Sequence, residues 1–540
     1  MSIRNILVTY ALTYSNGPIH IGHMLGYIQA DIWVRYQNMK GNNCQYISGS
    51  DTHGTPITLA AEKKNQSVKY FVDKIVSDHK KDLKDFLISL DEFQRTDTKA
   101  NKMLVEDIYK KLLENDDIKS QNINQIYDTE KSIFLPDRYV IGCCPKCNAS
   151  KQYGDGCEVC GTFYDAIDLQ NPTSIFSKKP VIQKKTKHYF FKIKKYQRNL
   201  QDWIKKSTQN SIINKLNEWL DFDLKDWNIS RDAPYLGFKI PNNPKKYFYV
   251  WFDAPIGYIS SFQSLHKKRK KLPSYWDSNN QDEIYQFIGK DISYFHTIFW
   301  PILLFAYKKF RLPTAIYSHG FLTVNGKKMS KSRGNFISAK KYIKFINPEY
   351  LRYYYASKLN NTINDIDLNI YDFQLKINTD LIGKFINLVS RCSVFIKNNN
   401  NNILSSSLVD KKLYQKFVNI SCDISRYYEN REFSKSIRII MKLCDTLNKF
   451  IEYYKPWKLV HENKKKLANQ ICSQVINLFK ILMIYLKPVL PITAKKVEDF
   501  LNIKSLQWKD IYNPLFNHKI NIFIPLLKRI DKKSLESLFK

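Results

Sequence analysis

Apolar residues near the N-terminus form one short continuous run and then a longer run at helical spacing. Residues 6–12 are largely apolar and include β-branched members, as expected for a strand that is buried on both faces of a parallel sheet. After a turn at Ser15–Pro18, apolar residues recur at helical spacing within His20–Met39, which predicts a helix. Strand, glycine-containing turn and helix in this order open a nucleotide-binding α/β domain.

The strand-like pattern returns later in the chain. Cys44–Ser48 predicts a second strand, and Gly49–Gly54 would form a loop at the carboxyl end of the sheet, where such folds place ligands. Further runs of this kind are Tyr247–Phe252, Ile284–Ile288 and Ala315–Ser318. A cysteine cluster separates the early runs from the late ones, so we expect a nucleotide-binding sheet that is split by an insertion from about residue 116 to 230.

From about residue 366 the pattern changes to long amphipathic helices. One apolar stripe runs from Leu381 to Ile396 and another from Ile437 to Ile451, which predicts an all-α second module. The asparagine-rich segment Asn398–Asn402 is expected to be a loop inside it. No apolar run approaches the ~20 residues that a membrane-spanning helix needs, and the short apolar N-terminus lacks a cleavage site. We therefore expect a soluble, cytoplasmic protein with reduced cysteines and no membrane partner.

Composition changes this picture only slightly. The chain has 540 residues, enough for several domains, and a formal net charge of +35. An excess of Lys and Arg favours a polyanionic partner, because phosphate contacts release counterions from nucleic acid. The chain is also rich in Lys, Asn, Ile, Tyr and Phe, and an AT-rich genome would produce this composition by drift, without selection for binding. Composition alone leaves both interpretations open.

The ten cysteines are unevenly placed, since five lie between Cys143 and Cys160. The scattered ones are predicted to be small buried hydrophobic residues, namely Cys44, Cys392, Cys422, Cys444 and Cys472. Within the cluster, two C-x-x-C pairs are separated by nine residues; their members are Cys144, Cys147, Cys157 and Cys160. Four thiolates at this spacing suit one tetrahedral zinc ion, which would be structural because no coordination position stays open. Cys143 is expected not to be a ligand.

Two polar motifs have chemistry suited to nucleotide binding. His20 and His23 lie at a predicted helix N-terminus, where two imidazoles and unpaired N–H groups can bind an α-phosphate, and Gly22 lets a nucleotide approach the backbone. Asn325–Gly334 carries three lysines and one arginine between two glycines, which suits a mobile lid that neutralises pyrophosphate. Each motif alone has a plainer interpretation, because lone histidines are usually structural and most lysine runs are solvated loops.

Taken together and in this order, the two motifs resemble the HIGH and KMSKS motifs of class I aminoacyl-tRNA synthetases. Longer segments resemble the methionyl-tRNA synthetases of the bacterial type with a single four-cysteine knuckle, and the resemblance runs from residue 3 to nearly 540. These segments are Ala11–Tyr14, Ile47–Pro56, Phe134–Gly161, Trp227–Pro241, Tyr247–Tyr258, Phe287–Pro301 and His319–Gly334. The resemblance implies an α/β fold with a Rossmann-like nucleotide-binding domain, split by a zinc-containing connective insertion and followed by an all-α anticodon-binding domain.

The resemblance also implies how the chain is divided. The catalytic domain would comprise residues 1–115 and 231–325, with the connective insertion at 116–230 between its halves. The KMSKS loop and stem-contact region would follow at 326–365, and the anticodon-binding domain with a C-terminal peptide at 366–540. Many bacterial members dimerise through an added C-terminal β-barrel module, which this sequence lacks, so a monomer is expected.

The resemblance further implies the residues of the active site. The methionine pocket would be lined by Leu12, Tyr14, Trp251, Ala254, Pro255, Tyr258, Ile292, His296 and Trp300. Asp51 would pair with the substrate ammonium, and Arg231 would lie near the substrate carboxylate and ATP. ATP would be held by Gly22, Gly289, Asp291 and Lys331, and the charge that spreads during the reaction by His20, His23, Lys328 and Lys331. Aromatic walls suit methionine, because rings make favourable contacts with a thioether sulfur.

By the same resemblance, Asn387 and Arg391 read the CAU anticodon together with Trp457. The implied reaction uses ATP with Mg²⁺ to activate L-methionine, which is then transferred to initiator and elongator tRNA(Met). Two positions depart from the family. Thr13 stands where relatives usually carry proline and is expected to loosen the first turn, and Gly383 replaces an asparagine used near the anticodon.

Three other functions stay open. A class I synthetase for another amino acid, such as cysteine, would share both motifs but have a tighter, metal-containing amino-acid site. A small-molecule adenylyltransferase would lack the helical module, which here spans about 170 residues. A non-catalytic tRNA-binding relative would have lost a histidine or lysine of the two motifs, and neither is lost.

Overall fold

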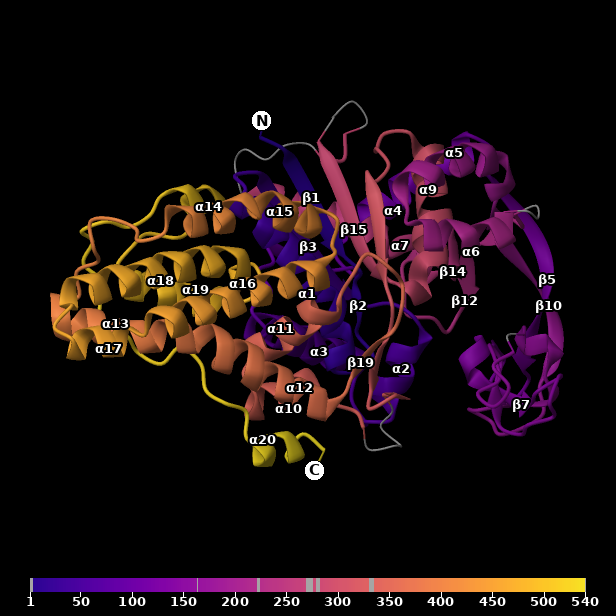
Figure 1. Cartoon of the computed structure of the whole chain (residues 1–540). Helices are drawn as coiled ribbons and strands as arrows, with labels where there is room; N and C mark the ends of the chain where they lie inside the picture. Colours follow the sequence, from indigo (N-terminus) through magenta and orange to yellow (C-terminus); the bar gives the residue numbers. More distant parts are fainter. Residues whose placement is uncertain are drawn as a thin grey trace.

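The computed structural model describes residues 3–162, 164–220, 224–268, 275–277, 282–329 and 335–539. Its centre is a six-stranded parallel sheet with the order β16-β15-β1-β3-β2, in which β4 also pairs with β3 (Figure 1). The strands are β1 (Asn5–Tyr10), β2 (Thr13–Tyr14), β3 (Asn43–Asp51), β4 (Glu92–Arg95), β15 (Glu283–Gly289) and β16 (Ala315–His319). β1 lies between β3 and β15, so the strand order changes direction there.

Helices cover both faces of this sheet, which explains why its strands read as continuous apolar runs. On one face Ile6 and Val8 pack with α1 (Ile21–Met39), α2 (Thr55–Glu62), α3 (Val68–Asp85), α10 (Ala339–Phe345) and α11 (Pro348–Lys358). On the other face Leu7 packs with α4 (Lys99–Glu114), α8 (Ile256–Lys268) and α9 (Trp300–Tyr307). Successive residues of β1 thus face different cores, as the two-residue period of a strand requires.

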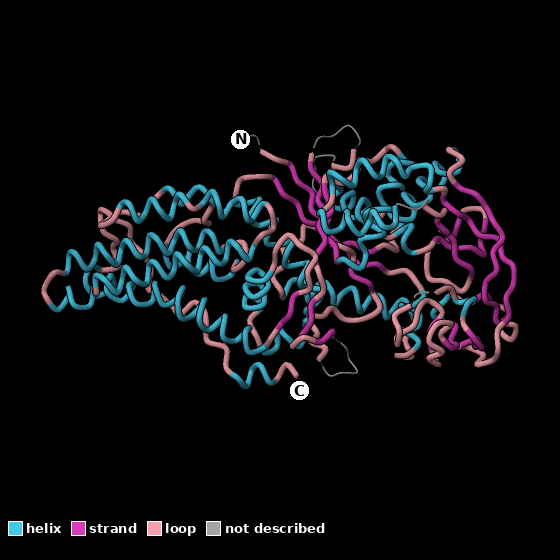
Figure 2. Tube along the Cα trace, turned by 45° about the vertical axis from the view of Figure 1, so that its right-hand side comes forward, coloured by secondary structure: helices cyan, strands magenta, loops and turns pink. Residues whose placement is uncertain are grey.

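The insertion is built on a long ribbon of two antiparallel strands, β5 (Ile118–Asp128) and β10 (Ile182–Phe191), which projects from the sheet (Figures 1 and 2). At its far end lies a cysteine knuckle (Val140–Ser174) with a small sheet of β7 (Val140–Cys143), β8 (Gln152–Tyr153) and β9 (Gln170–Ser174). β6 (Ile133–Phe134) and β11 (Trp227–Asn228) pair with the ribbon, and α5 (Gln197–Ser207) and α6 (Asn210–Leu220) lie at its near end.

Two strand predictions are corrected by the structure. Tyr247–Phe252 is not part of the parallel sheet: β14 (Asn243–Phe248) forms an antiparallel sheet with β12 (Ser230–Asp232) and β13 (Lys239–Ile240), and α7 (Val250–Asp253) follows. A short apolar run does not distinguish a strand from a buried helical segment. Gly49–Asp51 continue β3, so the expected loop begins only at Thr52 and Asp51 ends the strand.

The segment before the helical module forms a hairpin of β17 (Leu322–Val324) and β18 (Lys327–Lys328). Asn325 and Gly326 make its turn with φ of 49° and 72°, the left-handed region that both residue types tolerate. β17 pairs in parallel with β19 (Ile366–Leu368), and Asp367 Oδ1 accepts a hydrogen bond of 2.7 Å from the Gly326 N–H. The start of the basic loop is therefore tied to the chain that enters the helical module.

The module after β19 is all-α, as predicted (Figure 2). Its helices are α12 (Ile370–Lys376), the π-helix η6 (Ile377–Ile386), α13 (Asn387–Asn400), α14 (Lys411–Asn419), α15 (Ser421–Glu429), α16 (Phe433–Tyr454), α17 (Pro456–His461), α18 (Lys465–Leu486), α19 (Pro491–Leu501) and α20 (Lys532–Glu536). The predicted stripes are largely buried, but Asn398–Asn400 end α13 instead of forming a loop, and Cys422 is exposed rather than buried.

The central helix of this module also corrects an expectation. By length and apolar composition α18 is sufficient to cross a membrane, and no other helix of the described residues is. However, 83% of its most apolar window is buried inside the protein, and its neighbours α13, α16 and α17 pack around it. Burial on all sides explains an apolar circumference in the core helix of a bundle.

Helix α1 joins the sheet to the helical module. Asp31 of α1 has no exposed surface and lies 2.6 Å from the equally buried Arg352 of α11 and 2.7 Å from Arg35. Arg352 also donates to the carbonyl oxygens of Pro488 and Val489, beyond the end of α18. Burial alone would raise the pKa of Asp31, but the two guanidinium groups hold it below its usual value.

We expect Arg352→Ala to lower the stability of the joined modules by ~3–5 kcal/mol, because it leaves the Asp31 carboxylate buried with only Arg35 beside it. Thermal unfolding followed by circular dichroism measures this as a loss of several degrees. The matched control is Lys102→Ala, which breaks a half-exposed pair with Glu106 and should leave the curve unchanged. Equal curves for Arg352→Ala and the wild type would contradict the assignment.

Candidate active site

A cleft of about 830 Å³ opens at the carboxyl ends of the parallel strands. Tyr10–Tyr14 line it from the end of β1 onward, Asp51 at the end of β3, and Gly289 at the end of β15. Between β1 and β15 the strand order changes direction, which is where open parallel sheets bind ligands. The ribbon and knuckle contribute a rim that includes Gln125 and Asp155. The cleft therefore collects residues from both halves of the split sheet and from the insertion.

His20 and His23 lie at the cleft end of α1. His20 caps the helix: its Nδ1 accepts from the Gly22 N–H at 3.1 Å, while His23 Nδ1 accepts from the His20 N–H at 3.2 Å. The two rings stack with centroids 3.7 Å apart. Because each Nδ1 accepts, a neutral ring carries its proton on Nε2. The N–H groups of the first turn are themselves hydrogen-bonded, to Ile337 O, His20 Nδ1 and His20 O. What the helix end offers a ligand is therefore the Nε2–H edge of each imidazole together with the positive end of the helix dipole.

The surroundings of His23 favour its neutral form. Its ring borders the cleft, but most of the volume around it is protein rather than water. This desolvation, together with the neighbouring His20 ring, lowers the pKa of His23 well below its usual value. Gly22 is closely packed, since a Cβ there would come within 2.7 Å of Met329 Cε and 2.9 Å of the His20 ring. A side chain at this position would therefore push apart the cap and the start of the basic loop.

Asp51 is the carboxylate of the cleft, and it belongs to a buried acidic cluster. Behind it, His53 Nδ1 lies 2.6 Å from Asp253 Oδ2, and both residues are at most 3% exposed. Asp51 Oδ1 accepts from the His53 backbone N–H at 3.2 Å. Burial, with Asp253 as a second negative charge nearby, raises the pKa of Asp51 to about 8. Such a carboxyl group favours a cationic partner, because a cation would restore its charged form.

Arg231 reaches the cleft from β12. Its guanidinium carbon lies 3.7 Å from the centre of the Tyr249 ring, and its Nη1 donates to Ser230 O at 2.8 Å. Tyr249 and Tyr235 also line the cleft. Neither tyrosine was foreseen from the sequence. Tyr249 precedes the first turn of α7. The sequence pattern was interpreted as one strand over Tyr247–Phe252, so Tyr249 was counted as a strand residue and not as a residue of the site.

The residues expected to line the methionine pocket divide into two groups. Leu12, Tyr14, Trp251 and Ile292 line the cleft. Ala254, Pro255, Tyr258, His296 and Trp300 are instead buried behind its wall. Trp251 contacts the buried group, because its ring stacks on Phe295 with centroids 3.8 Å apart and meets the His296 ring edge-on at 5.9 Å. The structure therefore brings all nine residues to one region but leaves five of them outside the open cleft.

The buried group has a defined hydrogen-bond order. His296 lies in a π-helical turn, Phe295–Phe299, and its Nδ1 donates to Ile292 O at 3.1 Å. Its Nε2 must then accept from the Tyr258 hydroxyl, 2.8 Å away. Burial lowers the pKa of His296 to about 4, so the ring is neutral at neutral pH and keeps Nδ1 as the donor and Nε2 as the acceptor.

Of the four residues expected to bind ATP, three line the cleft: Gly22, Gly289 and Asp291. Lys328, expected to take part in catalysis, lines it as well. At Gly289 a Cβ would meet Asp291 Oδ1 at 2.4 Å, so a side chain there would displace the Asp291 carboxylate. Lys331 lies outside the described residues. His319 also lines the cleft at the end of β16, and the rule that ligands bind where parallel strands end would have found it.

The four cysteines predicted as ligands converge. The Sγ atoms of Cys144, Cys147, Cys157 and Cys160 lie within 4.8 Å of one another, with 3.8 Å and 3.5 Å for two of the pairs. Thiolates at ~2.3 Å from a tetrahedral zinc would be about 3.8 Å apart. Asn148 and Gly161, which follow the two C-x-x-C pairs, both have left-handed φ and close equivalent turns. The cluster can hold one metal ion, and Cys143 lies outside it.

The residues assigned to the anticodon lie on the helical module. Arg391 of α13 stacks 5.0 Å from the Trp457 ring and pairs with Glu452 at 2.7 Å, and Asn387 is exposed one helical turn earlier. Gly383 lies in the π-helix η6 just before α13. Thr13, the other position that departs from the family, was expected to loosen the first turn. Its hydroxyl is instead buried and hydrogen-bonded to the Tyr27 hydroxyl at 2.6 Å.

Comparisons with known proteins agree along the whole chain. The family model "tRNA synthetases class I (M)" matches residues 6–393, and "Anticodon binding domain of methionyl tRNA ligase" matches residues 405–519. The chain is 48% identical to the methionine–tRNA ligase of Francisella tularensis subsp. tularensis (strain WY96-3418), over 100% of this chain and 81% of that protein. It is 46% identical to that of Vesicomyosocius okutanii subsp. Calyptogena okutanii (strain HA), over 100% and 99%.

The fold has a solved counterpart. The Mycobacterium tuberculosis methionyl-tRNA synthetase in complex with methionyl-adenylate superposes with a TM-score of 0.80 at 20% identity, covering 97% of this chain and 99% of that one. The expected architecture is thereby confirmed: a split nucleotide-binding sheet, a cysteine-bearing insertion and a helical anticodon-binding module.

The raised pKa of Asp51 has a consequence for stability. An aspartate whose pKa is raised on folding binds its proton more tightly in the folded chain, so its ionisation destabilises the fold as pH rises from about 4 to about 8. We expect Asp51→Asn to be more stable than the wild type by a few kcal/mol at pH 8, and the difference to vanish near pH 4. Thermal unfolding across this range measures the difference. A difference in stability between Asp51→Asn and the wild type that does not change with pH would contradict the raised pKa of Asp51.

Proposed function

The chain belongs to the methionyl-tRNA synthetases of class I, and on that premise we propose that it activates L-methionine with ATP and transfers it to tRNA(Met), both initiator and elongator. The observation that carries this proposal is the cleft, where the His20–His23 end of α1 and a carboxylate with a raised pKa share one cavity at the point where the strand order changes direction. Such a cavity suits a substrate with an ammonium group beside a reacting phosphate.

The phosphate side of the reaction needs positioning and charge stabilisation rather than covalent chemistry. A methionine carboxylate oxygen forms a bond to the α-phosphorus of ATP, and the bond to the departing pyrophosphate breaks. Negative charge then spreads over the phosphoryl oxygens, where the Nε2–H groups of His20 and His23 can donate beside the positive end of the α1 dipole. Lys328 and Lys331 are the proposed partners of pyrophosphate, and Gly289 and Asp291 those of the adenosine. Mg²⁺ bound to ATP would neutralise part of the phosphate charge.

The amino-acid side uses two charged side chains of the cleft. We propose that the Asp51 carboxylate binds the methionine ammonium, since the substrate cation offsets the cost of charging this buried group. Arg231 would hold the methionine carboxylate near the α-phosphate. Leu12 and Tyr14 would cover the substrate backbone.

The methionine side chain requires a change in the wall. Trp251 and Phe295 close off the buried group of Tyr258, His296 and Trp300. A thioether that reaches these rings would gain favourable sulfur–aromatic contacts, and Trp251 would have to move to admit it. Ala254, Pro255 and Ile292 would complete the proposed pocket.

The first experiment is ATP–pyrophosphate exchange with each of the twenty amino acids, in the absence of tRNA. Exchange supported by methionine alone is the expected result. Exchange with cysteine or another amino acid would contradict the proposed pocket but not the class. No exchange from folded, metal-loaded protein would favour a non-catalytic tRNA-binding protein. The cysteine alternative also expects a metal in the amino-acid site, whereas within the described ranges the one cluster of metal-binding side chains is the knuckle.

We further propose that the metal of the knuckle is zinc, held by Cys144, Cys147, Cys157 and Cys160. Four thiolates at near-tetrahedral separations suit this ion, and its role would be to cross-link two tight turns at the rim of the cleft. We also propose that the chain divides at about residues 115, 230, 325 and 365. Elements begin or end close to each of these positions: β5 begins at Ile118, β12 begins at Ser230, β17 ends at Val324 and β19 begins at Ile366. Whether the chain acts as a monomer stays a prediction, which light scattering of the purified protein tests.

Cysteine substitution tests the metal site. We expect one zinc ion per chain by elemental analysis of the wild type, and loss of that ion in Cys144→Ser. Cys143→Ser is the matched control, because Cys143 is the adjacent residue in the chain but lies outside the cluster, and it should retain the ion. Equal zinc in both variants, or loss in the control, would contradict the ligand assignment.

For the helical module we propose that Asn387, Arg391 and Trp457 bind anticodon bases. Bases stack on aromatic rings and arginine planes, and the Arg391–Trp457 stack offers both. Glu452 would release Arg391 when tRNA binds, since the pair is largely exposed and therefore weak.

Trp457→Ala should lower kcat/KM for aminoacylation of tRNA(Met) by ~10–100-fold, because a base loses its stacking partner. ATP–pyrophosphate exchange without tRNA should be unchanged, since Trp457 lies outside the cleft. Tyr70→Ala, which removes an aromatic ring that is 57% exposed on α3, is the control and should affect neither assay. A matching loss in both assays would show that the substitution damages the enzyme as a whole.

A further inference from the structure

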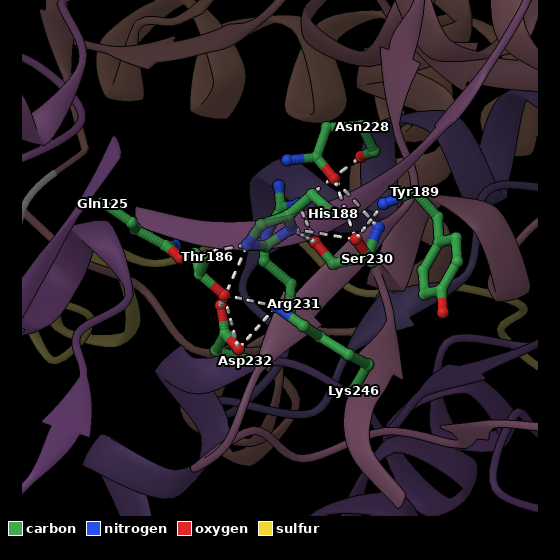
Figure 3. A network of polar contacts seen from close by, with 9 residues as sticks. All are labelled: Gln125, Thr186, His188, Tyr189, Asn228, Ser230, Arg231, Asp232 and Lys246. Atoms are coloured by element: carbon green, nitrogen blue, oxygen red, sulfur yellow. Dashed lines mark hydrogen bonds and ion pairs between the residues drawn. The ribbon is translucent and has the colours of Figure 1, made fainter. Parts of the chain in front are cut away.

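A buried polar network joins the ribbon of the insertion to β12, the strand that carries Arg231 (Figure 3). His188 of β10 has no exposed surface. Its Nε2 lies 2.9 Å from Asp232 Oδ2 and 3.1 Å from Gln125 Oε1, and its Nδ1 lies 2.8 Å from Ser230 Oγ. None of the roles described above uses this histidine.

The network holds both neighbours of Arg231. Successive side chains of a strand point to opposite faces, so Ser230 and Asp232 share one face of β12 while Arg231 points the other way, into the cleft. The single ring of His188 contacts both residues of that face. Ser230 O is itself shared, because Arg231 Nη1 donates to it at 2.8 Å and His188 Nδ1 lies 3.2 Å from it.

The network also determines which charges face the cleft. Asp232 is adjacent to Arg231 in sequence, and its carboxylate would be a natural partner for the guanidinium. Instead Lys246, opposite Asp232 on β14, lies 2.6 Å from Asp232 Oδ1, and His188 engages Oδ2. Burial alone would raise the pKa of Asp232, but the hydrogen bonds from His188 and Lys246 hold it below its usual value. Among the described residues Arg231 makes no ion pair. Asp137 lines the same cleft and the charge of Arg231 acts on it, but burial raises the pKa of Asp137, so Arg231 stays available to an anionic ligand.

We propose that His188 is a positioning residue for methionine activation, acting through Ser230 and Asp232 to hold Arg231 in the cleft. The inference rests on the proposed role of Arg231 at the substrate carboxylate and ATP. It gives the insertion a part in the first reaction step, before any tRNA is present, because His188 lies on the ribbon and Arg231 on the strand that the ribbon holds.

A double-mutant cycle tests this coupling. ATP–pyrophosphate exchange is measured without tRNA for His188→Ala and His188→Gln, each with Arg231 present and with Arg231→Ala. We expect His188→Ala to lower kcat/KM for methionine by ~10-fold or more when Arg231 is present, and by less than ~2-fold when it is absent. His188→Gln keeps a donor toward Asp232 without the ring, so its loss should be smaller and depend on Arg231 in the same way.

Tyr196→Phe is the matched control. It removes a 2.7 Å hydrogen bond to Asp117 at the base of the same ribbon, away from β12, and should leave exchange unchanged in both backgrounds. Equal losses from a His188 variant with and without Arg231 would overturn the positioning role, as would full activity of folded His188→Ala. Full activity of Arg231→Ala alone would instead overturn the role of Arg231, and with it the inference.

Discussion

The burial of helix α1 between the parallel sheet and the helical module is the constraint on which the rest of the structure depends. Fifteen of its 19 residues are buried, including the charged Asp31. On one flank it packs on β1 and β3, and on the other it is tied to the helical module through Trp33, whose Nε1 donates to Glu429 O at 3.0 Å. A helix held on both flanks has little freedom to tilt, so its N-terminus stays fixed at the end of β1.

Because the N-terminus of α1 is fixed, the rings of His20 and His23 are held in place at the cleft. His20 and His23 use one ring nitrogen each to cap α1, so a neutral ring carries its proton on the other nitrogen, beside the helix dipole. In the same cleft Asp51 is kept in surroundings that disfavour its charge, so a cationic substrate would offset the cost of ionising it. A site of this kind is less stable than its neutral variants, which is the usual relation between stability and function at binding sites.

Sequence patterns were most informative where the interaction is local. The two C-x-x-C pairs lie within one short segment, and the apolar spacing after His20 places a helix N-terminus there, so spacing indicated the cysteine cluster and the helix end. It did not indicate that His20 caps the helix. Long-range contacts gave no such signal. His188 meets Asp232 across 44 residues and Gln125 across 63, and a lone histidine in a strand looks structural. The short helix α7 was missed for a related reason, because tertiary packing selects it over the strand that the apolar run Tyr247–Phe252 suggests.

The proposed chemistry requires the N-terminus of α1 to bind the reacting phosphate while Asp51 binds the ammonium of the same substrate. A crystal structure of the chain with a non-hydrolysable methionyl-adenylate analogue would show both contacts at once. We expect the ammonium at the Asp51 carboxylate, the phosphoryl-equivalent group within hydrogen-bond distance of His20 or His23 Nε2, and the adenosine beside Gly289 and Asp291. An analogue bound with its phosphoryl-equivalent group away from α1, or with its ammonium away from Asp51, would refute the proposed roles of these residues.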